Sequence, residues 1–497
     1  MEYNVLETET PENLGIPSGA IMAFLDRILD HRLNLHSLLI LRGGKLAAEG
    51  YWAPFSRDRK HRLYSSSKSF TSLAVGRMIS EGRLSLQDRV VQFFPEKLPQ
   101  QVHPWIARAT IRDMLMMADC HESPTYSFDD TDWLAGWFNK APDHLPGMIY
   151  TYNTACTQVL CAIVEKLTGM KFLAYLRPVF DAIGASPDIW CIEAPDGCSF
   201  GGSGVMATPR DLARTALLFL NMGRHDGQQL ISENYMREAT TRQIDNYIDH
   251  ATSDDDIEHQ QGYGYQIWRT RHNGFCFYGM GCQLAIALPD KDLLVVTTGD
   301  TQGTLPDTSE VLSALWENLY DQISDGPLPE NPGARNELAG RLLKLAMPVV
   351  QGVLTQPLTA RINGITYDMA ENPMGIKTVR YQFRENTGTL AYVNATGAHE
   401  ISFGLGWNQP GVFPETHYSG RRIGTPKNAG YEMYASAAWR DEKTLLTVCY
   451  ITDDYLGSLA INATFSDQYV TLLMHKRAEA FLNEYHGFAS GRTGSLV

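Results

Sequence analysis

Two apolar runs near the amino end predict a β-hairpin. "LHSLLILRGGKLAAEGYW" places them on either side of Gly43 and Gly44, a composition typical of a tight turn between antiparallel strands. Later stretches, "GYGYQIWRT", "FCFYGMGCQLAIALP" and "DLLVVTTG", predict further consecutive antiparallel strands between residues 262 and 299. The chain therefore has strand-forming segments on both sides of a long middle part.

Helical patterns fill that middle part. "TIRDMLMM" and "TPRDLARTALLFLNMG" each begin with a threonine, Thr110 and Thr208, and carry an aspartate three residues later, as in a capping box. "TSEVLSALWENLYDQI" predicts a closing helix. Strands grouped at both ends around helices predict an α+β fold, in which one antiparallel sheet is flanked by helices and carries a helical subdomain.

A Pro- and Gly-rich break, "SDGPLPENPGARNE", predicts a domain boundary. We expect a first domain over residues 1–325, a linker and helix over 326–349, and a second domain over 350–497. The second domain contains repeated alternating segments that predict an all-β antiparallel barrel. The final "HKRAEAFLNEY", residues 475–485, predicts a terminal helix.

Composition narrows the function. A chain of 497 residues has room for two or three domains. Its net charge of −14 opposes a nucleic-acid partner, which requires a basic footprint. The acidic start lacks a signal-peptide pattern, and no apolar run is long enough to span a bilayer, so no membrane partner is expected. Eight scattered cysteines are typical of reduced thiols, which indicates a cytoplasmic protein.

No nucleotide fingerprint or metal-ligand spacing is present, so neither a cofactor nor a metal is expected. The acidic stretch "TSDDDIEHQ", residues 252–260, admits two readings, a cation site and a solvated loop. Adjacent acids rarely converge on one ion, which favours the loop.

Two serines compete as nucleophile. Ser199 lies in "GCSFG", which matches the nucleophile-elbow pattern but lacks the strand before it and the helix after it. Ser65 begins "SSSKSFTSLAVG", where Lys68 follows three residues later on the same helical face. A serine hydroxyl needs an adjacent base, and a desolvated lysine near a helix start can supply one. The alternative for this motif is a helix cap followed by a surface lysine.

With these motifs in this order, the chain resembles the serine β-lactamase and penicillin-binding-protein superfamily, in particular its class-C-like esterases and amide hydrolases. The resemblance extends from about Leu35 to Ile323. It rests on "YSSSKSFTSLAVG" as the S-x-x-K box, "PGMIYTYNTACTQVLCAIVEKLTG" as the tyrosine box and "YGMGCQLAIALPDKDLLVV" as the strands of the third box. The second domain resembles the lipocalin-like barrel appended to some members.

The resemblance implies a role for each matching catalytic residue. Ser65 matches the acylating nucleophile, Lys68 its activating partner and Tyr152 the catalytic tyrosine, with Tyr150 as the rival tyrosine of that box. Tyr152 would act as general base or proton relay. This role requires a nearby cation that lowers the pKa of the phenol, and Lys68 is the expected source.

The substrate-contacting groups follow from the same resemblance. The backbone N–H groups of Ser65 and Cys282 are the expected oxyanion hole. Asn153, Gly279 and Gly281 are expected to contact the substrate.

Two boxes depart from the family pattern. Thr154 stands where the tyrosine box normally has asparagine, and Asn153 is its nearest amide. The third box, residues 279–281, lacks the lysine or histidine that commonly holds a substrate carboxylate. These departures oppose β-lactam and D-alanyl-peptide substrates, which rely on that anchor.

The expected function is that of a serine hydrolase, of the carboxylesterase or amidase type, which cleaves a small ester or amide through an acyl-enzyme on Ser65. β-Lactamase, D-amino-acid peptidase and acyltransferase activity would use the same residues. A non-catalytic, ligand-binding family member is the alternative from another class. The expected partner is a small-molecule substrate. A homo-oligomer formed through the second domain stays open as an alternative.

Overall fold

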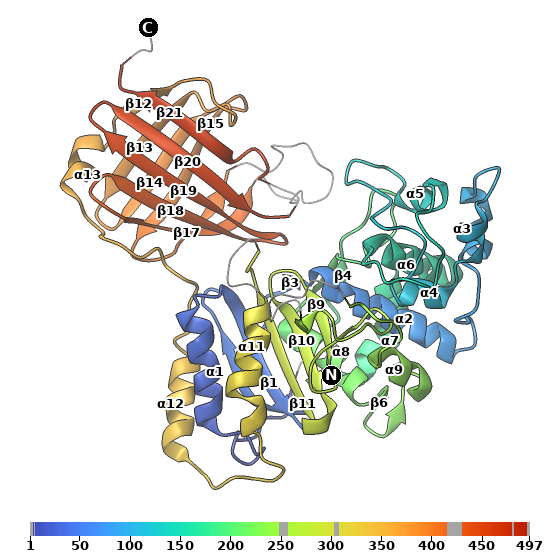
Figure 1. Ribbon diagram of the computed structural model, residues 1–497. Helices are drawn as coiled ribbons and strands as arrows, with labels where there is room; N and C mark the ends of the chain where they lie inside the picture. Colours follow the sequence, from blue (N-terminus) through green and yellow to red (C-terminus); the bar gives the residue numbers. More distant parts are fainter. Residues whose placement is uncertain are drawn as a thin grey trace. The chain divides into compact units, whose positions relative to one another are not determined.

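The computed structural model describes residues 3, 5–247, 257–302, 308–414, 430–479 and 482–494 (Figure 1). The chain divides into two compact units, Met1–Ala346 and Met347–Val497. This division falls within the segment expected to be a linker and helix, residues 326–349.

A six-stranded antiparallel sheet forms the centre of the first unit, in the order β2-β1-β11-β10-β9-β8. Its strands are β1 (Leu35–Arg42), β2 (Lys45–Tyr51), β8 (Trp268–Arg269), β9 (Phe275–Gly279), β10 (Gln283–Leu288) and β11 (Leu293–Gly299). β1 pairs with β2 on one side and with β11 on the other. The predicted α+β fold, in which both ends of the domain share one sheet, is confirmed.

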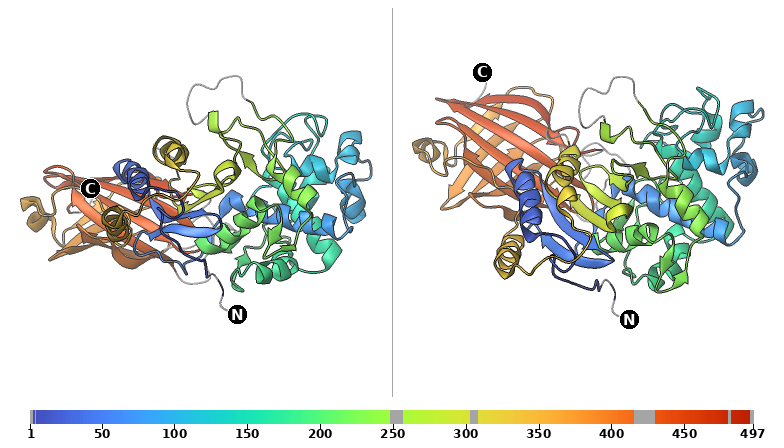
Figure 2. Two further views of the ribbon diagram at one scale, coloured as in Figure 1. Left: turned by 90° about the horizontal axis from the view of Figure 1, so that it is seen from below. Right: turned by 60° about the horizontal axis from the view of Figure 1, so that its bottom comes forward.

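Both faces of this sheet are covered by helices. Leu38 and Ile40 of β1 pack in a core with α1 (Ser18–Asp30) and α11 (Ser309–Asn318), whereas Leu39 and Leu41 pack in the core on the other face. This alternation follows from the two-residue period of a strand. Figure 2 shows α1 and α11 side by side on their face. On the opposite face, α8 (Pro209–Leu220) packs on β10 and β11.

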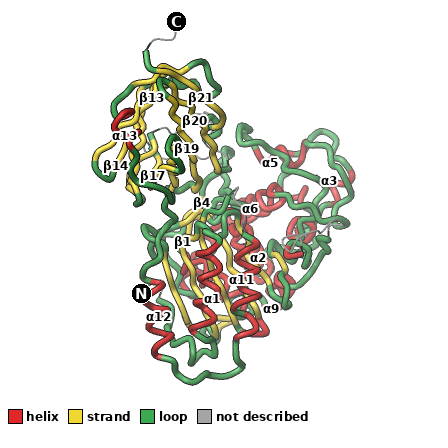
Figure 3. Tube along the Cα trace, turned by 60° about the vertical axis from the view of Figure 1, so that its left-hand side comes forward, coloured by secondary structure: helices red, strands yellow, loops and turns green. Residues whose placement is uncertain are grey.

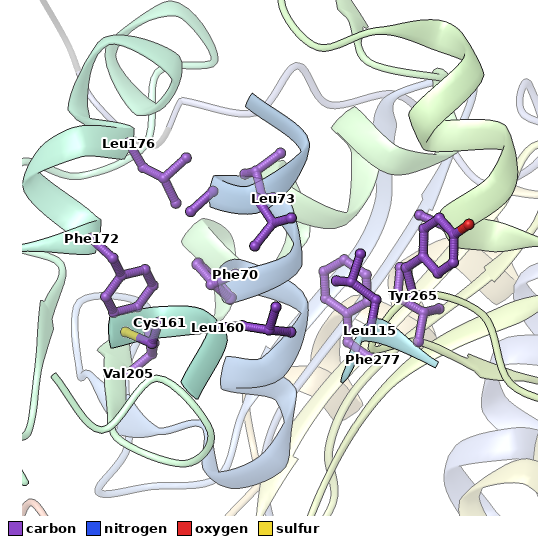
Figure 4. Packing of buried hydrophobic residues seen from close by; sticks show 14 of the residues in the cluster. Phe70, Leu73, Leu115, Leu160, Cys161, Phe172, Leu176, Val205, Tyr265 and Phe277 are labelled. Carbon is purple, nitrogen blue, oxygen red and sulfur yellow. The ribbon is translucent and has the colours of Figure 1, made fainter. Parts of the chain in front are cut away.

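The helical subdomain is built around α2 (Ser67–Ser80), whose residues from Ser67 to Gly76 are all buried. Figure 4 shows Phe70 and Leu73 of this helix among side chains from several other segments. Its other helices are α3 (Pro104–Arg108), α4 (Ile111–Leu115), α5 (Trp133–Asn139), α6 (Thr154–Thr168), α7 (Phe172–Ala182) and α9 (Glu233–Thr240). Short strands accompany them: β3 (His61–Arg62), β4 (Trp190–Cys191), β5 (Val205–Ala207), β6 (Arg224–His225) and β7 (Gln228–Gln229). Both predicted capping boxes are present, at Thr110 and at Thr208.

One helix of the expected linker segment belongs to the first unit. α12 (Pro332–Leu342) begins with Asn331 as its cap and Pro332 at the first turn. It packs on α1 and β2, and Arg341 forms an ion pair with Asp26 of α1. None of the helices in the described part of the chain is long and apolar enough to cross a membrane.

The second unit is a closed barrel, as the alternating pattern predicts, and Figure 3 shows strands joined by loops, with the short helix α13. Nine strands close the ring because β15 pairs with β14 and also, in parallel, with β17, while β16 pairs with β17. Its elements are α13 (Pro357–Ile362), β12 (Thr366–Met369), β13 (Thr378–Arg384), β14 (Thr387–Val393), β15 (Ala398–Leu405), β16 (Gln409–Phe413), β17 (Tyr431–Trp439), β18 (Thr444–Thr452), β19 (Leu456–Ser466), β20 (Tyr469–Arg477) and β21 (His486–Arg492). The predicted terminal helix is wrong, because its first residues, His475 to Arg477, continue β20.

Candidate active site

Ser65 lies in a single 3₁₀ turn, Tyr64–Ser66, that leads directly into α2. The segment before it is held by β3, which pairs with β5. Tyr64 has a positive φ of 45°, which non-glycine residues rarely adopt. Such conformations persist only where the surrounding structure holds them, so the backbone next to Ser65 is tightly constrained.

Lys68 lies one turn after Ser65 and is 1% exposed. Its Nζ donates hydrogen bonds to Ser65 Oγ at 3.0 Å and to the carbonyl oxygen of Gly202 at 2.8 Å. The amino group is thus aimed at the serine hydroxyl from a fixed, buried position. The alternative of a surface lysine beside a helix cap is excluded by this burial.

Tyr152 lies just before α6 and approaches the same two residues. Its ring centroid is 5.0 Å from Lys68 Nζ, and its hydroxyl interacts with the side chains of Ser65 and Trp268. Burial raises the pKa of the Tyr152 phenol above its ordinary value, and the interactions with Ser65 and Trp268 offset this only in part. The expectation that Lys68 lowers this pKa is therefore corrected: desolvation dominates, and the phenol is neutral at neutral pH.

The turn between β9 and β10 packs directly against the Ser65 segment. A Cβ at Gly279 would lie 2.3 Å from the carbonyl oxygen of Leu63, and Ser66 Oγ donates to the carbonyl oxygen of Gln283 at 2.6 Å. Gly279 and the adjoining turn are buried, and the turn contains two left-handed residues, Gly281 (φ 78°) and Cys282 (φ 74°). The backbone proposed from the sequence to bind the oxyanion and the substrate thus lies beside the turn that carries the serine.

The side chain of Cys282 packs in the protein interior. Its Sγ lies 3.3 Å from Thr301 Oγ1 and 3.6 Å from Thr308 Oγ1, and the residue is fully buried. The role of the Cys282 N–H in an oxyanion hole stays a prediction.

Asn153 is fully buried, and its side chain forms hydrogen bonds within the protein interior. Its Oδ1 accepts from the N–H of Ala155 at the start of α6, and its Nδ2 donates to Asp119 at 3.2 Å. Asp119 also accepts from Trp137 Nε1 at 2.8 Å, and burial raises the pKa of its carboxyl. This network anchors the segment that carries Tyr152, and it leaves the expected substrate contact of Asn153 without structural support.

Arg62 is a neighbour of the site that sequence reasoning missed. The side chain is 2% exposed, and its guanidinium donates to the carbonyl oxygen of Ser203 at 2.9 Å and to Ser203 Oγ at 3.0 Å. It also lies 4.5 Å from the ring centroid of Tyr64. Because Gly202 precedes Ser203, Arg62 holds the loop whose carbonyl oxygen receives Lys68. In the sequence, the only local signal for this role was the position of the arginine, two residues before Tyr64.

The rival nucleophile Ser199 is 3% exposed and lies in a glycine-rich loop rather than between a strand and a helix. In the same region the donor atoms of Cys161, Glu165 and Cys198 lie within 4.8 Å of one another, a grouping that could hold a metal ion. Sequence spacing did not reveal this cluster. Of the acidic stretch 252–260, residues 252–256 lie outside the described part of the chain.

The family follows from comparison with known proteins. A model of the family described as Beta-lactamase matches residues 24–315, more than half of the chain. This chain belongs to that family.

The individual proteins that match this chain share limited sequence identity with it. The 6-aminohexanoate-dimer hydrolase of Paenarthrobacter ureafaciens is 31% identical over 219 residues, which cover 40% of this chain and 55% of that protein. The chain thus spans about half the length of this curated relative. Among solved structures, a putative beta-lactamase from Bacteroides dorei DSM 17855 has a TM-score of 0.52 at 13% identity, covering 61% of this chain and 99% of that one. A putative 6-aminohexanoate-dimer hydrolase from Bacillus anthracis has a TM-score of 0.47 at 15% identity, covering 69% and 86%.

Proposed function

We propose that the protein is a serine hydrolase that cleaves a small ester or amide through an acyl-enzyme on Ser65. The observation that carries this proposal is the hydrogen bond from the buried Lys68 to Ser65 Oγ, with the Tyr152 hydroxyl at the same oxygen. In this arrangement Lys68 accepts the proton of the Ser65 hydroxyl, and Tyr152 passes a proton on to the leaving group. The amide hydrolase among the relatives is consistent with this chemistry.

The first half of the reaction forms the acyl-enzyme. Lys68, as the uncharged amine, accepts the proton of Ser65 and becomes an ammonium as Oγ bonds to the substrate carbonyl carbon. The backbone N–H groups of Ser65 and Cys282 donate to the oxyanion. As the tetrahedral species collapses, neutral Tyr152 gives its proton to the leaving oxygen or nitrogen and regains one from Lys68. The bond to the leaving group breaks, and the Ser65 proton has in effect moved to that group.

The second half releases the acid. Water attacks the acyl carbon, its proton passes to the same Lys68–Tyr152 pair, and Ser65 regains a proton when the ester bond breaks. An amine or alcohol in place of water would make the enzyme an acyltransferase with the same residues. Gly279 and Gly281 would contribute main-chain atoms to the substrate site.

The test is acylation by 4-nitrophenyl acetate, followed by intact-protein mass and peptide mapping. The native protein should gain one acetyl group on the peptide that contains Ser65, and Ser65→Ala should not. Ser199→Ala is the matched control, because it removes the rival serine, and it should react as the native protein does. An adduct that persists in Ser65→Ala and disappears in Ser199→Ala would overturn the proposal. A folded native protein that neither reacts nor turns over the ester would favour the ligand-binding alternative.

A further inference from the structure

Tyr152 belongs to a group of six aromatic side chains, which we call the aromatic wall. Trp268 lies at its centre, with ring centroids 5.4 Å from Tyr152, 5.4 Å from Tyr263 and 5.8 Å from Tyr278. Tyr150 and His259 complete the wall, at 6.1 and 5.2 Å from the Trp268 ring. These rings come from four separate segments, so the wall is a product of the tertiary fold.

The wall is an accessible surface rather than closed core. Of its six members only Tyr263 is buried, at 1% exposure, and the other five are half-buried. Exposed apolar side chains adjoin it in the chain: Met148 (67%) and Ile149 (58%) precede Tyr150, and Ile257 (41%) precedes His259. Large apolar residues left in water next to a candidate active site are typical of a binding surface.

A buried polar atom lies within this surface. Among the described residues, the hydroxyl of Tyr150 has no hydrogen-bond partner. Burial raises the pKa of Tyr150 well above its ordinary value, so the hydroxyl keeps its proton and remains a donor. A buried donor without an acceptor is costly, and an acceptor atom on a bound molecule would satisfy it.

The position of the wall defines which part of a substrate it meets. In the proposed reaction, which this inference takes as its basis, Tyr152 protonates the leaving group. A leaving group within reach of the Tyr152 hydroxyl therefore lies close to Trp268, whose ring centroid is 5.4 Å from that of Tyr152 and around which the other rings pack. A cationic leaving group is disfavoured there, because Lys68 carries the Ser65 proton at that stage and its Nζ is 5.0 Å from the Tyr152 ring centroid.

We propose that the aromatic wall binds the leaving group of the substrate and that this group is an uncharged aromatic alcohol or amine. The substrate class is thus an aryl ester or an anilide, with the ring of the leaving group against Trp268 and Tyr278. Offset or edge-to-face contacts between rings favour such a ligand over an aliphatic one of equal size.

The experiment compares two acetate esters, 1-naphthyl acetate and hexafluoroisopropyl acetate, whose leaving alcohols have closely similar acidity. Because the acyl group is shared, the ratio of their kcat/KM values reports on the leaving-group site alone. Tyr278→Ala should lower the naphthyl preference roughly tenfold, mainly through KM. Tyr278→Phe, which keeps the ring, should restore it. Tyr469→Ala, which removes a 58% exposed tyrosine of β20, is the matched control and should leave both rates unchanged.

The outcomes separate this inference from the proposed function. If the native protein hydrolyses both esters through Ser65 and Tyr278→Ala leaves their ratio within twofold of native, the aromatic wall does not bind the leaving group. If neither ester acylates Ser65 in the folded native protein, the proposed function itself fails. Thermal unfolding of each variant identifies loss of folding. If Tyr278→Ala does not fold, Tyr278→Phe provides the test. A tenfold fall in the ratio of the two kcat/KM values, with the ring retained, would contradict the proposal.

Discussion

Lys68 Nζ donates to Ser65 Oγ at 3.0 Å from a position that is almost completely buried. The i, i+3 spacing places both side chains on one side of the first helical turn, and the Lys68 amino group also donates to the carbonyl oxygen of Gly202. The serine and lysine are therefore positioned before any substrate arrives.

Replacing Lys68 with methionine should lower kcat/KM for an activated ester by at least about 100-fold, the range expected when a general base is lost. The methionine keeps the length of the side chain and removes only its polar end. Steady-state hydrolysis measures the loss, and circular dichroism checks the fold. Lys166→Met is the control: its ammonium pairs with Glu96 at the surface, and its removal should leave the rate unchanged.

Gly279→Ala should disturb the Ser65 segment directly. The new Cβ would lie 2.3 Å from the Leu63 carbonyl oxygen, so the backbone before the serine must move. We expect at least a tenfold fall in the acylation rate, in line with the sensitivity of reactions to small misplacements. The rate of acetylation of Ser65 measures this effect. Gly326→Ala, where no atom lies within 4 Å of an added Cβ, should react at the native rate.

His36 and His61, two buried histidines of the first unit that contact each other, should make its stability depend on pH. His36 Nδ1 lies 3.1 Å from His61 Nε2, and burial lowers the pKa of His36 well below 6.5 and that of His61 to about 3. Between pH 6.5 and 3 the unfolded chain therefore binds more protons than the folded one, and stability falls as the pH is lowered. Each histidine contributes a slope of up to about 1.4 kcal/mol per pH unit.

Urea unfolding of the first unit at a series of pH values measures this slope. His61→Gln should reduce it between pH 6 and 4, because the substituted residue no longer takes up a proton in the unfolded state. His103→Gln removes an exposed histidine and should change the slope little. A native slope that His61→Gln leaves intact would show that other groups titrate in this range.

Thr208→Ala should destabilise the first unit by about 1 kcal/mol, as expected for loss of a helix cap. Thr208 Oγ1 accepts from the Asp211 N–H at 3.2 Å and donates to Asp211 Oδ2 at 2.7 Å. Chemical denaturation measures the change. Thr241→Ala, at an exposed hydroxyl that bonds to the preceding helical turn, should shift stability by less than about 0.5 kcal/mol. If both variants lost the same free energy of unfolding, the effect would come from loss of a threonine in general and not from loss of the helix cap.

Local patterns in the sequence predicted the parts of the site that lie close together in the chain. Ser65 and Lys68 are one helical turn apart, so their contact depends on helix geometry alone. Tyr152 was found only through family resemblance, and its pKa shift was predicted with the wrong sign. The cause is burial of the phenol in the folded protein, which no spacing within the tyrosine box reveals.

The fold shows the same division between local and long-range information. Hairpins and capped helices were predicted because neighbouring residues determine them. Residues 475–485 have a helical composition, yet His475 pairs with His486 across β20 and β21. Closure of the barrel requires an extended segment there, and this requirement overrides local preference.

The pairing of β1 with β11 also sets an order of events during synthesis. Leu35–Arg42 leaves the ribosome long before Leu293–Gly299, its partner in the sheet. Until then the early hairpin presents an open apolar edge, which is prone to pair with other chains. In the nascent first unit this edge stays unpaired until β11 has been translated, and truncation before residue 293 would leave it open permanently.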